Sequence, residues 1–362
     1  MRKIKSFAFF AGTALMLAAL CFGSVGCSQK PLVGVLMPKL DVDRWSIDGA
    51  SIKRQLEAKQ YAVIEEYASD NAATQIQQIE TIIKNNNCKA LIIAGVDCYG
   101  LNDVLKKAHD KKIIIIAYDR LIMNTPYVDY YVTFDNFGIG ADQGKYIIDK
   151  LELDKNGGPP VNMEILSGAP DDSTSIENYD GQMSTLKPYI DSGKIVVKSG
   201  KTSFEATAVA DWTNINAEAH LEDILNNYYS NDKIDIILSA NDSMAMGAME
   251  ALRNAGYTKE NWPLITGMDC DLANVLAIRD GWQDTSAFID MRLMAMIAVN
   301  LAEDALYGKN YPNLNRSYYN NMEHGTRNII PTAVCPFERV DANNYIDILV
   351  TGHRLYDIED LK

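Results

Sequence analysis

The sequence has little of what builds metal centres or disulfide frameworks. Six cysteines and four histidines are spread over 362 residues, and no CxxC or HExxH spacing occurs, so we expect no metal site. Cys88 and Cys98 flank a predicted strand that holds them too far apart to pair. For Cys270 and Cys335, a disulfide and two buried free thiols both stay open.

Positive charge is also scarce. The chain has 34 Lys and Arg residues against 48 Asp and Glu residues, a net charge of -14, which argues against a nucleic-acid partner and fits a neutral or cationic small ligand. No GxSxG motif occurs, and Gly138, Gly140 and Gly144 do not form the dinucleotide fingerprint but fit close packing of a helix. We therefore expect no enzyme and no cofactor. The alternative is an enzyme that acts on glycosides through a carboxylate pair such as Asp119 and Asp242.

The first residues form an export signal. A basic start, an apolar run from Phe7 to Phe22 and small residues up to Gly26 lead to Cys27, as in a signal peptide over residues 1–26. Cys27 is the candidate lipidation site, followed by a linker that ends at residue 31. Plain cleavage after Gly26 is the alternative. Either way we expect an exported protein, periplasmic or held at the cell surface as a lipoprotein.

From Leu32 onward, apolar runs alternate with segments of helical periodicity. The first unit ends with a predicted strand at residues 112–118, and a second unit of the same kind begins near Phe134 and includes a helix over residues 244–255. Strands buried on both faces and separated by crossover helices indicate parallel, doubly wound sheets. The predicted fold class is therefore α/β, with two Rossmann-like lobes and a cleft between them.

Polar and aromatic residues follow the predicted strands, at the edge where ligands of such sheets bind. Carboxylates, guanidinium groups and amides match sugar hydroxyls, and an indole ring stacks on the apolar face of a sugar. Helix capping is the alternative role for each aspartate, Asp242 included. Their joint placement favours a sugar site, and the predicted ligand-binding residues are Arg44, Trp45, Asp119, Arg120, Asp172, Trp212, Asn216, Asp242 and Asp269.

Several short stretches resemble the periplasmic monosaccharide-binding proteins, above all the xylose-binding and multiple-sugar-binding branch. The resemblance runs in order along the mature chain. It is carried by Arg44-Trp45, AYDRLI at 117–122, TFDN at 133–136, PDD at 170–172, LKPYIDSGK at 186–194 and GMD at 267–269.

This resemblance implies two lobes joined by a three-segment hinge, with crossovers near Asp135, near Asp269 and after Gly308. Asp135 and Asn136 would lie at the hinge. The expected lobes comprise residues 32–135 plus about 270–310, and residues 136–269 plus about 311–362. The lobes would close on an aldopentose or aldohexose such as xylose, arabinose, glucose or galactose. A monomer would then deliver the sugar to an ABC permease or, alternatively, present it to a chemotaxis or two-component sensor partner.

The sequence departs from the family pattern at three places. Ser173 and Thr174 stand where two asparagines are common, Met268 replaces a glutamine, and Ile289 replaces a lysine. Losing a buried donor leaves its former partner unpaired at a cost of about 1 to 3 kcal/mol. The identity of the sugar is therefore not carried over from the family.

Overall fold

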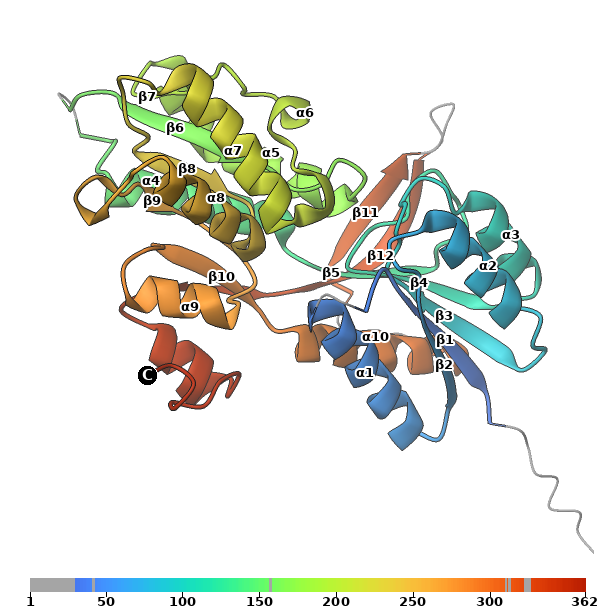
Figure 1. The fold of residues 1–362 in the computed structure, drawn as a ribbon. Helices are drawn as coiled ribbons and strands as arrows, with labels where there is room; N and C mark the ends of the chain where they lie inside the picture. The colour runs from blue at the N-terminus through green and yellow to red at the C-terminus, as the bar shows by residue number, and fades with distance from the viewer. Residues whose placement is uncertain (1–29, 41–42, 156–157, 310, 312–313, 322–326) are drawn as a thin grey trace, which may run out of the picture.

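The chain forms two α/β lobes connected by a narrow waist (Figure 1). The structure is a computed structural model and describes residues 30–362 apart from 41–42, 156–157, 310, 312–313 and 322–326. The predicted leader and Cys27 lie outside the described residues. No helix among the described residues is long and apolar enough to span a bilayer.

The first lobe is built on a seven-stranded sheet whose strand order is β11-β12-β5-β4-β3-β1-β2. All neighbours are parallel except β11 and β12, which pair antiparallel. The strands are β1 (Leu32–Met37), β2 (Ala62–Tyr67), β3 (Cys88–Ile93), β4 (Ile114–Tyr118), β5 (Tyr130–Phe134), β11 (Arg316–Asn321) and β12 (Arg327–Cys335).

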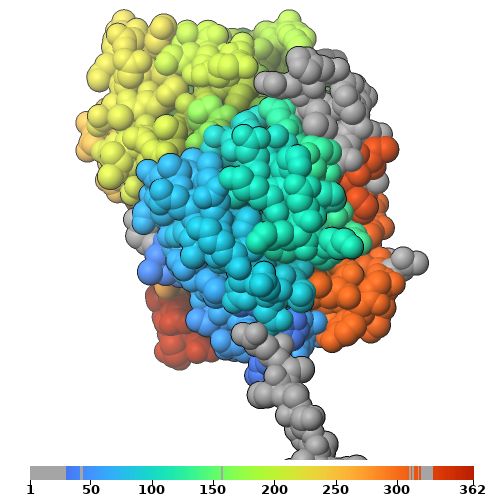
Figure 2. All heavy atoms as spheres, turned by 90° about the vertical axis from the view of Figure 1, so that its right-hand side faces the viewer, coloured from blue at the N-terminus to red at the C-terminus, as the bar shows by residue number. Residues whose placement is uncertain are grey.

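Helices cover both faces of this sheet. α1 (Asp43–Ala58) and α10 (Met291–Leu306) pack on one face, and α2 (Ala72–Ile82) and α3 (Asn102–Asp110) pack on the other. Strands β1, β3 and β4 are almost wholly buried because each carries apolar side chains toward both faces. Figure 2 shows the N-terminal part of this lobe in blue to cyan, with the second lobe above it in yellow and green.

The second lobe has a four-stranded parallel sheet in the order β7-β6-β8-β9. Its strands are β6 (Val161–Leu166), β7 (Ile195–Val196), β8 (Ile236–Ser239) and β9 (Leu264–Ile265). Its main helices are α4 (Asn136–Lys150), α5 (Ser173–Asp191), α7 (Asn214–Tyr228) and α8 (Asp242–Asn254). A two-stranded sheet of β10 (Thr285–Ile289) and β13 (Phe337–Asp341), helix α9 (Leu272–Arg279) and the π-helix η3 (Ile346–Gly352) lie below it (Figure 1).

Glycines let α4 and α5 lie unusually close. A Cβ atom on Gly140 would stand 2.0 Å from the carbonyl oxygen of Asn178, and one on Gly181 would stand 2.1 Å from that of Phe137. The interpretation of the Gly138–Gly144 segment as a close-packing element therefore holds for Gly140. The contact holds the second and third turns of α5 against α4.

The division of the chain between the lobes differs from the expectation. The chain crosses after β5, as expected near Asp135, but then only after β10, at Ile289–Asp290, and after β12, at Cys335–Phe337. Residues 316–335 extend the first sheet, whereas β10 lies with the second lobe because Ser286 Oγ donates to Asp242 at 2.9 Å. Of the segment 270–310 expected in the first lobe, α10 packs there, and Ala287 and Ile289 at the crossover contribute to the same hydrophobic cluster.

Candidate functional site

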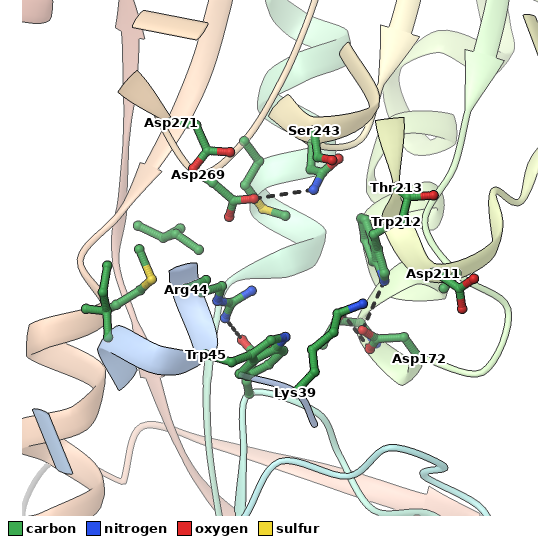
Figure 3. Close-up of a pocket in the computed structure, with 18 of the residues that line it drawn as sticks. Lys39, Arg44, Trp45, Asp172, Asp211, Trp212, Thr213, Ser243, Asp269 and Asp271 are labelled. Atoms are coloured by element: carbon green, nitrogen blue, oxygen red, sulfur yellow. Dashed lines mark hydrogen bonds and ion pairs between the residues drawn. The ribbon is translucent and has the colours of Figure 1, made fainter. Parts of the chain in front are cut away.

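A cleft of about 840 Å³ lies between the lobes at the carboxyl ends of their strands. Figure 3 shows the side chains that face it: Arg44, Trp45 and Lys39 from the first lobe, and Asp172, Trp212, Ser243 and Asp269 from the second. The volume falls within the range of 300 to 1,000 Å³ that is typical of small-molecule sites. Parallel sheets bind ligands at this edge, where the sequence also placed the site.

The first helix of the chain supplies one wall of the cleft. The Arg44 guanidinium donates to the Asp119 carboxylate and lies 4.7 Å above the Trp45 ring. A second carboxylate, that of Asp48, lies 3.8 Å from Arg44 Nε, one turn further along α1 and fully buried. Burial raises the pKa of Asp48 to about 7. Arg44 therefore stands between two carboxylates.

The turn after β4 presents the next two residues. Asp119 has a backbone φ of 63°, a value that residues other than glycine rarely adopt. Its carbonyl oxygen accepts hydrogen bonds from Tyr131 Oη at 2.6 Å and Thr133 Oγ1 at 3.0 Å. These buried bonds hold the strained turn. Arg120, which follows, then lies 5.3 Å from the Trp45 ring, so that both arginines flank one indole.

Asp172 connects the two lobes. Its carboxylate lies 2.8 Å from Arg120 Nε of the first lobe and accepts from Trp212 Nε1 at 3.2 Å. The same side chain caps α5, since Oδ1 accepts from the Thr174 amide at 2.9 Å. Ser173 Oγ also accepts from the Leu121 amide at 2.8 Å across the lobe boundary. Ser173 and Thr174, where the sequence departs from the family pattern, thus serve the lobe contact and the helix cap.

Trp212 is presented on a strained turn. Asp211 and Trp212 have φ values of 60° and 56°. The indole lies against Gly168, where a Cβ atom would stand 2.1 Å from the ring. Asn216, predicted to bind the ligand, does not line the cleft; its amide donates to the Ala210 carbonyl at 2.9 Å. In the described structure it stabilises the turn that carries Trp212.

Asp269 lies on the second-lobe wall of the cleft, with a φ of 105°. Asn241 Nδ2 donates to Asp269 Oδ2 at 3.4 Å, whereas Oδ1 is buried and has no hydrogen-bond partner among the described residues. Burial raises the pKa of Asp269 to about 7, although the nearby Arg44 opposes this change. An unpaired buried carboxylate oxygen is costly unless a ligand donates to it.

Asp242, a predicted ligand residue, lies behind the cleft wall. It is fully buried and accepts from Gln283 Nε2 at 2.8 Å, Ser286 Oγ at 2.9 Å and the Asp271 amide at 3.0 Å. The residue before it, Asn241, faces the cleft and caps α8 in its place. Neighbouring residues at a strand end point to opposite sides, so a shift of one position exchanges the two roles.

The hinge residues act in different ways. Asp135 caps α4 and forms a bidentate ion pair with Arg316 of β11, at 2.7 and 2.9 Å. Asn136 is buried, lines the cleft and donates to Thr133 Oγ1 at 3.2 Å.

The sequence analysis missed one residue of the cleft, Lys39, which lines it and pairs with Asp70 at 2.5 Å. Its place directly after β1 was the available signal.

The described part of the chain gives no sign of metal or disulfide chemistry. No group of three His, Cys, Asp or Glu side chains in it is arranged to hold a metal ion. Cys88, Cys98, Cys270 and Cys335 are buried free thiols, so the structure resolves the two alternatives for Cys270 and Cys335. Burial raises the pKa of all four thiols, which makes them poor nucleophiles.

The sequence matches known proteins over nearly its whole length. The family model described as a periplasmic binding protein domain matches residues 33–310. A multiple sugar-binding periplasmic protein of Azospirillum brasilense is 37% identical over 94% of this chain and 94% of its own. A multiple sugar-binding periplasmic receptor of Rhizobium radiobacter is 36% identical over 99% of this chain and 100% of its own.

Solved structures agree with these matches. A solute-binding protein of an ABC transporter from Clostridium phytofermentans, with bound β-D-glucose, is 42% identical, has a TM-score of 0.84 and covers 91% of this chain and 100% of its own. A carbohydrate transporter solute-binding protein from Chloroflexus aurantiacus in complex with D-glucose is 26% identical, with a TM-score of 0.79, over 91% of this chain and 97% of its own.

Proposed function

The chain belongs to the periplasmic binding protein family, in its sugar-binding branch, and on this premise we propose that it captures one aldose between its lobes. It is an extracytoplasmic sugar-binding protein of the kind that serves ABC transporters. Its task is reversible binding: an open form admits the sugar, and contacts from both lobes favour the closed form. Only a sugar that binds the closed form more tightly can shift that balance.

The cleft between the lobes is the observation that carries this proposal. Trp45 of the first lobe and Trp212 of the second both face it, beside the carboxylate of Asp119 and the Arg120–Asp172 pair. Indole rings stack on the apolar face of a pyranose, and carboxylates and guanidinium groups bind neighbouring hydroxyls. We assign ligand contacts to Arg44, Trp45, Asp119, Arg120, Asp172, Trp212 and Asp269, and add Asn241.

D-glucose is the first ligand to test, because two structural relatives hold it. The wall here offers Ile289, buried and apolar, at a position where the family pattern has a lysine. The carboxylate oxygen Asp269 Oδ1 instead has no protein donor among the described residues. We therefore propose that a hydroxyl of the sugar donates to Asp269, a contact that replaces a protein donor.

Calorimetric titration of the purified chain with glucose, galactose, xylose and arabinose tests this function. We expect one site per chain and saturable binding of at least one of these aldoses. Absence of binding to every pentose and hexose in such a panel would refute the sugar assignment. Incubation with glucose or with aryl glucosides, followed by chromatography, should return the starting material unchanged; a product would favour the enzyme alternative.

Delivery to an ABC permease, with the chain held at the membrane by a lipid on Cys27, completes the proposal. Mass spectrometry of the mature N-terminus would show a diacylglyceryl group on Cys27, or plain cleavage after Gly26 if the anchor is absent. Presentation of the sugar to a sensor is the second candidate, because one relative carries the name of a receptor. Loss of sugar uptake on deletion of the chain favours transport; loss of a sugar response with uptake intact favours sensing.

A further inference from the structure

The charge of the cleft is strongly one-sided. Among the described residues, seven aspartates line it against three basic side chains, those of Lys39, Arg44 and Arg120. A neutral sugar needs donors and acceptors but no net charge. The excess of carboxylates therefore bears on which substituents a sugar in this cleft can carry.

Each of the three basic groups already has an aspartate partner in the protein. Lys39 Nζ lies 2.5 Å from Asp70, and Arg120 Nε lies 2.8 Å from Asp172. Arg44 donates to Asp119 and has the buried Asp48 at 3.8 Å on its other side. An anionic group that entered the cleft would have to share one of these cations with a carboxylate that already faces it, and the like charge of that carboxylate opposes its binding.

Two aspartates of the cleft could instead bind a positively charged group of a ligand. Asp269 Oδ1 is buried without a hydrogen-bond donor among the described residues, and Asp211 lies on the exposed turn next to Trp212. Burial raises the pKa of Asp269 to about 7, a sign that a neighbouring positive charge would stabilise its ionised form. An ammonium group has only donors and fits an oxygen that lacks one.

We propose that this cleft selects sugars by charge: it accepts an aldohexose that carries an ammonium group alongside the neutral aldohexose, and it rejects hexuronates and sugar phosphates. The proposal rests on the proposed function, since it assigns a substrate range to the same aldose site. It makes Asp269 and the internally paired arginines the determinants of that range.

Matched ligands separate charge from shape. The purified chain would be titrated at pH 8.0, where Asp269 is mainly ionised, with D-glucose, 6-amino-6-deoxy-D-glucose, D-glucuronamide and D-glucuronate, which differ at one carbon. Glucuronamide has nearly the shape of glucuronate without its charge. We expect glucuronate to bind roughly 100-fold more weakly than glucuronamide, and the amino sugar to bind within about tenfold of glucose, as Coulomb energies at a partly solvated site imply.

Two results would overturn the proposal. Glucuronate that binds as well as glucuronamide would show that charge is not selected, and an amino sugar as weak as glucuronate would show that any change at that carbon is excluded. Equal weakness of the amide and the acid would likewise mean that shape decides. Failure of all four ligands, glucose included, would instead refute the aldose site itself, so the two proposals fail in distinguishable ways.

A pair of variants tests where the charge acts. Asp211→Asn removes one negative charge at the cleft and keeps a residue type that tolerates its φ of 60°. Asp191→Asn makes the same change of net charge at the last residue of the 19-residue helix α5, about 27 Å from its start at the cleft. We expect the glucuronate-to-glucuronamide ratio of dissociation constants to fall about threefold in the first variant only. Equal shifts in both would indicate a net-charge effect and overturn the local selection.

Discussion

The ion pair between Arg120 and Asp172 links the two lobes and supports a sharp prediction. The two side chains are only 12% and 4% exposed, and their atoms approach to 2.8 Å. An open form would separate them and return both to water. Asp172→Asn removes the charge, and its one amide oxygen can still cap α5 in the place of Oδ1. The NH2 group then replaces Oδ2 and faces two donors, Trp212 Nε1 and Arg120 Nε, so the substitution breaks both of these contacts.

The expected effect follows from removing one partner of a nearly buried charge pair, which costs about 2 to 5 kcal/mol. Arg120 keeps its hydrogen bond to the Gly95 carbonyl and some exposure to water, so we expect the lower end of this range, about 2 kcal/mol, to be lost from the closed form. The dissociation constant for glucose should therefore rise about 30-fold, at 1.4 kcal/mol per factor of ten. Because the pair forms on closure, the free energy of unfolding of the open protein should change by less.

Calorimetry on the wild type, Asp172→Asn, Arg120→Gln and the double variant would give the coupling energy between the two side chains. Small-angle scattering with and without glucose would show whether closure is impaired, and Asp191→Asn serves as the charge-matched control. A glucose affinity within 1.5-fold of the wild type for Asp172→Asn, or a coupling energy near zero, would refute the view that this pair holds the lobes together.

Three further predictions concern packing and protonation. Gly168→Ala should displace Trp212 from the cleft and weaken sugar binding at least tenfold by calorimetry, whereas Gly158→Ala, with open space around its Cβ, should have no effect. Asp242→Ala should lower the free energy of unfolding by about 3 kcal/mol in urea titrations, because it leaves buried donors unpaired; a loss below 1 kcal/mol would contradict this account. Burial, together with the carboxylates of Asp135 and Asp172, raises the pKa of Glu177 to about 7 despite Tyr318 and Arg316. A raised folded-state pKa means that stability falls as the pH rises from about 4.5 to 7. Asp48 and Asp269 contribute to the same fall, so the melting temperature of Glu177→Gln should decrease less than that of the wild type over that interval.

The sequence predicts the edge of the sheets at which the structure has its cleft. Arg44, Trp45, Asp119 and Arg120 follow buried strands, and the carboxyl ends of parallel strands meet at one edge whatever the details of the sheet. The choice between Asn241 and Asp242 could not be made in this way. Both follow β8, and the polar residues that hold Asp242 behind the wall, Gln283 among them, come from a segment some forty residues later.

The lobe boundaries were harder to predict because they depend on strand pairing. β12 shows the same apolar character as a strand of either lobe, and its place beside β5 follows from a register that no local pattern encodes. β10 is equally ambiguous, since its antiparallel partner β13 lies almost fifty residues later. The positions of the second and third crossovers therefore follow from tertiary pairing.

Backbone strain gathers on the residues that form the cleft. Asp119, Trp212 and Asp269 come from three separate segments, yet each has a positive φ, a conformation that costs of order 1 to 3 kcal/mol. Glycine would relieve that cost at any of them but would remove the side chain that faces the cleft. Buried hydrogen bonds, such as those from Tyr131 and Thr133 to the Asp119 carbonyl, offset the strain. The backbone conformation thus fixes the direction of these side chains, so they lose little conformational entropy when a sugar binds.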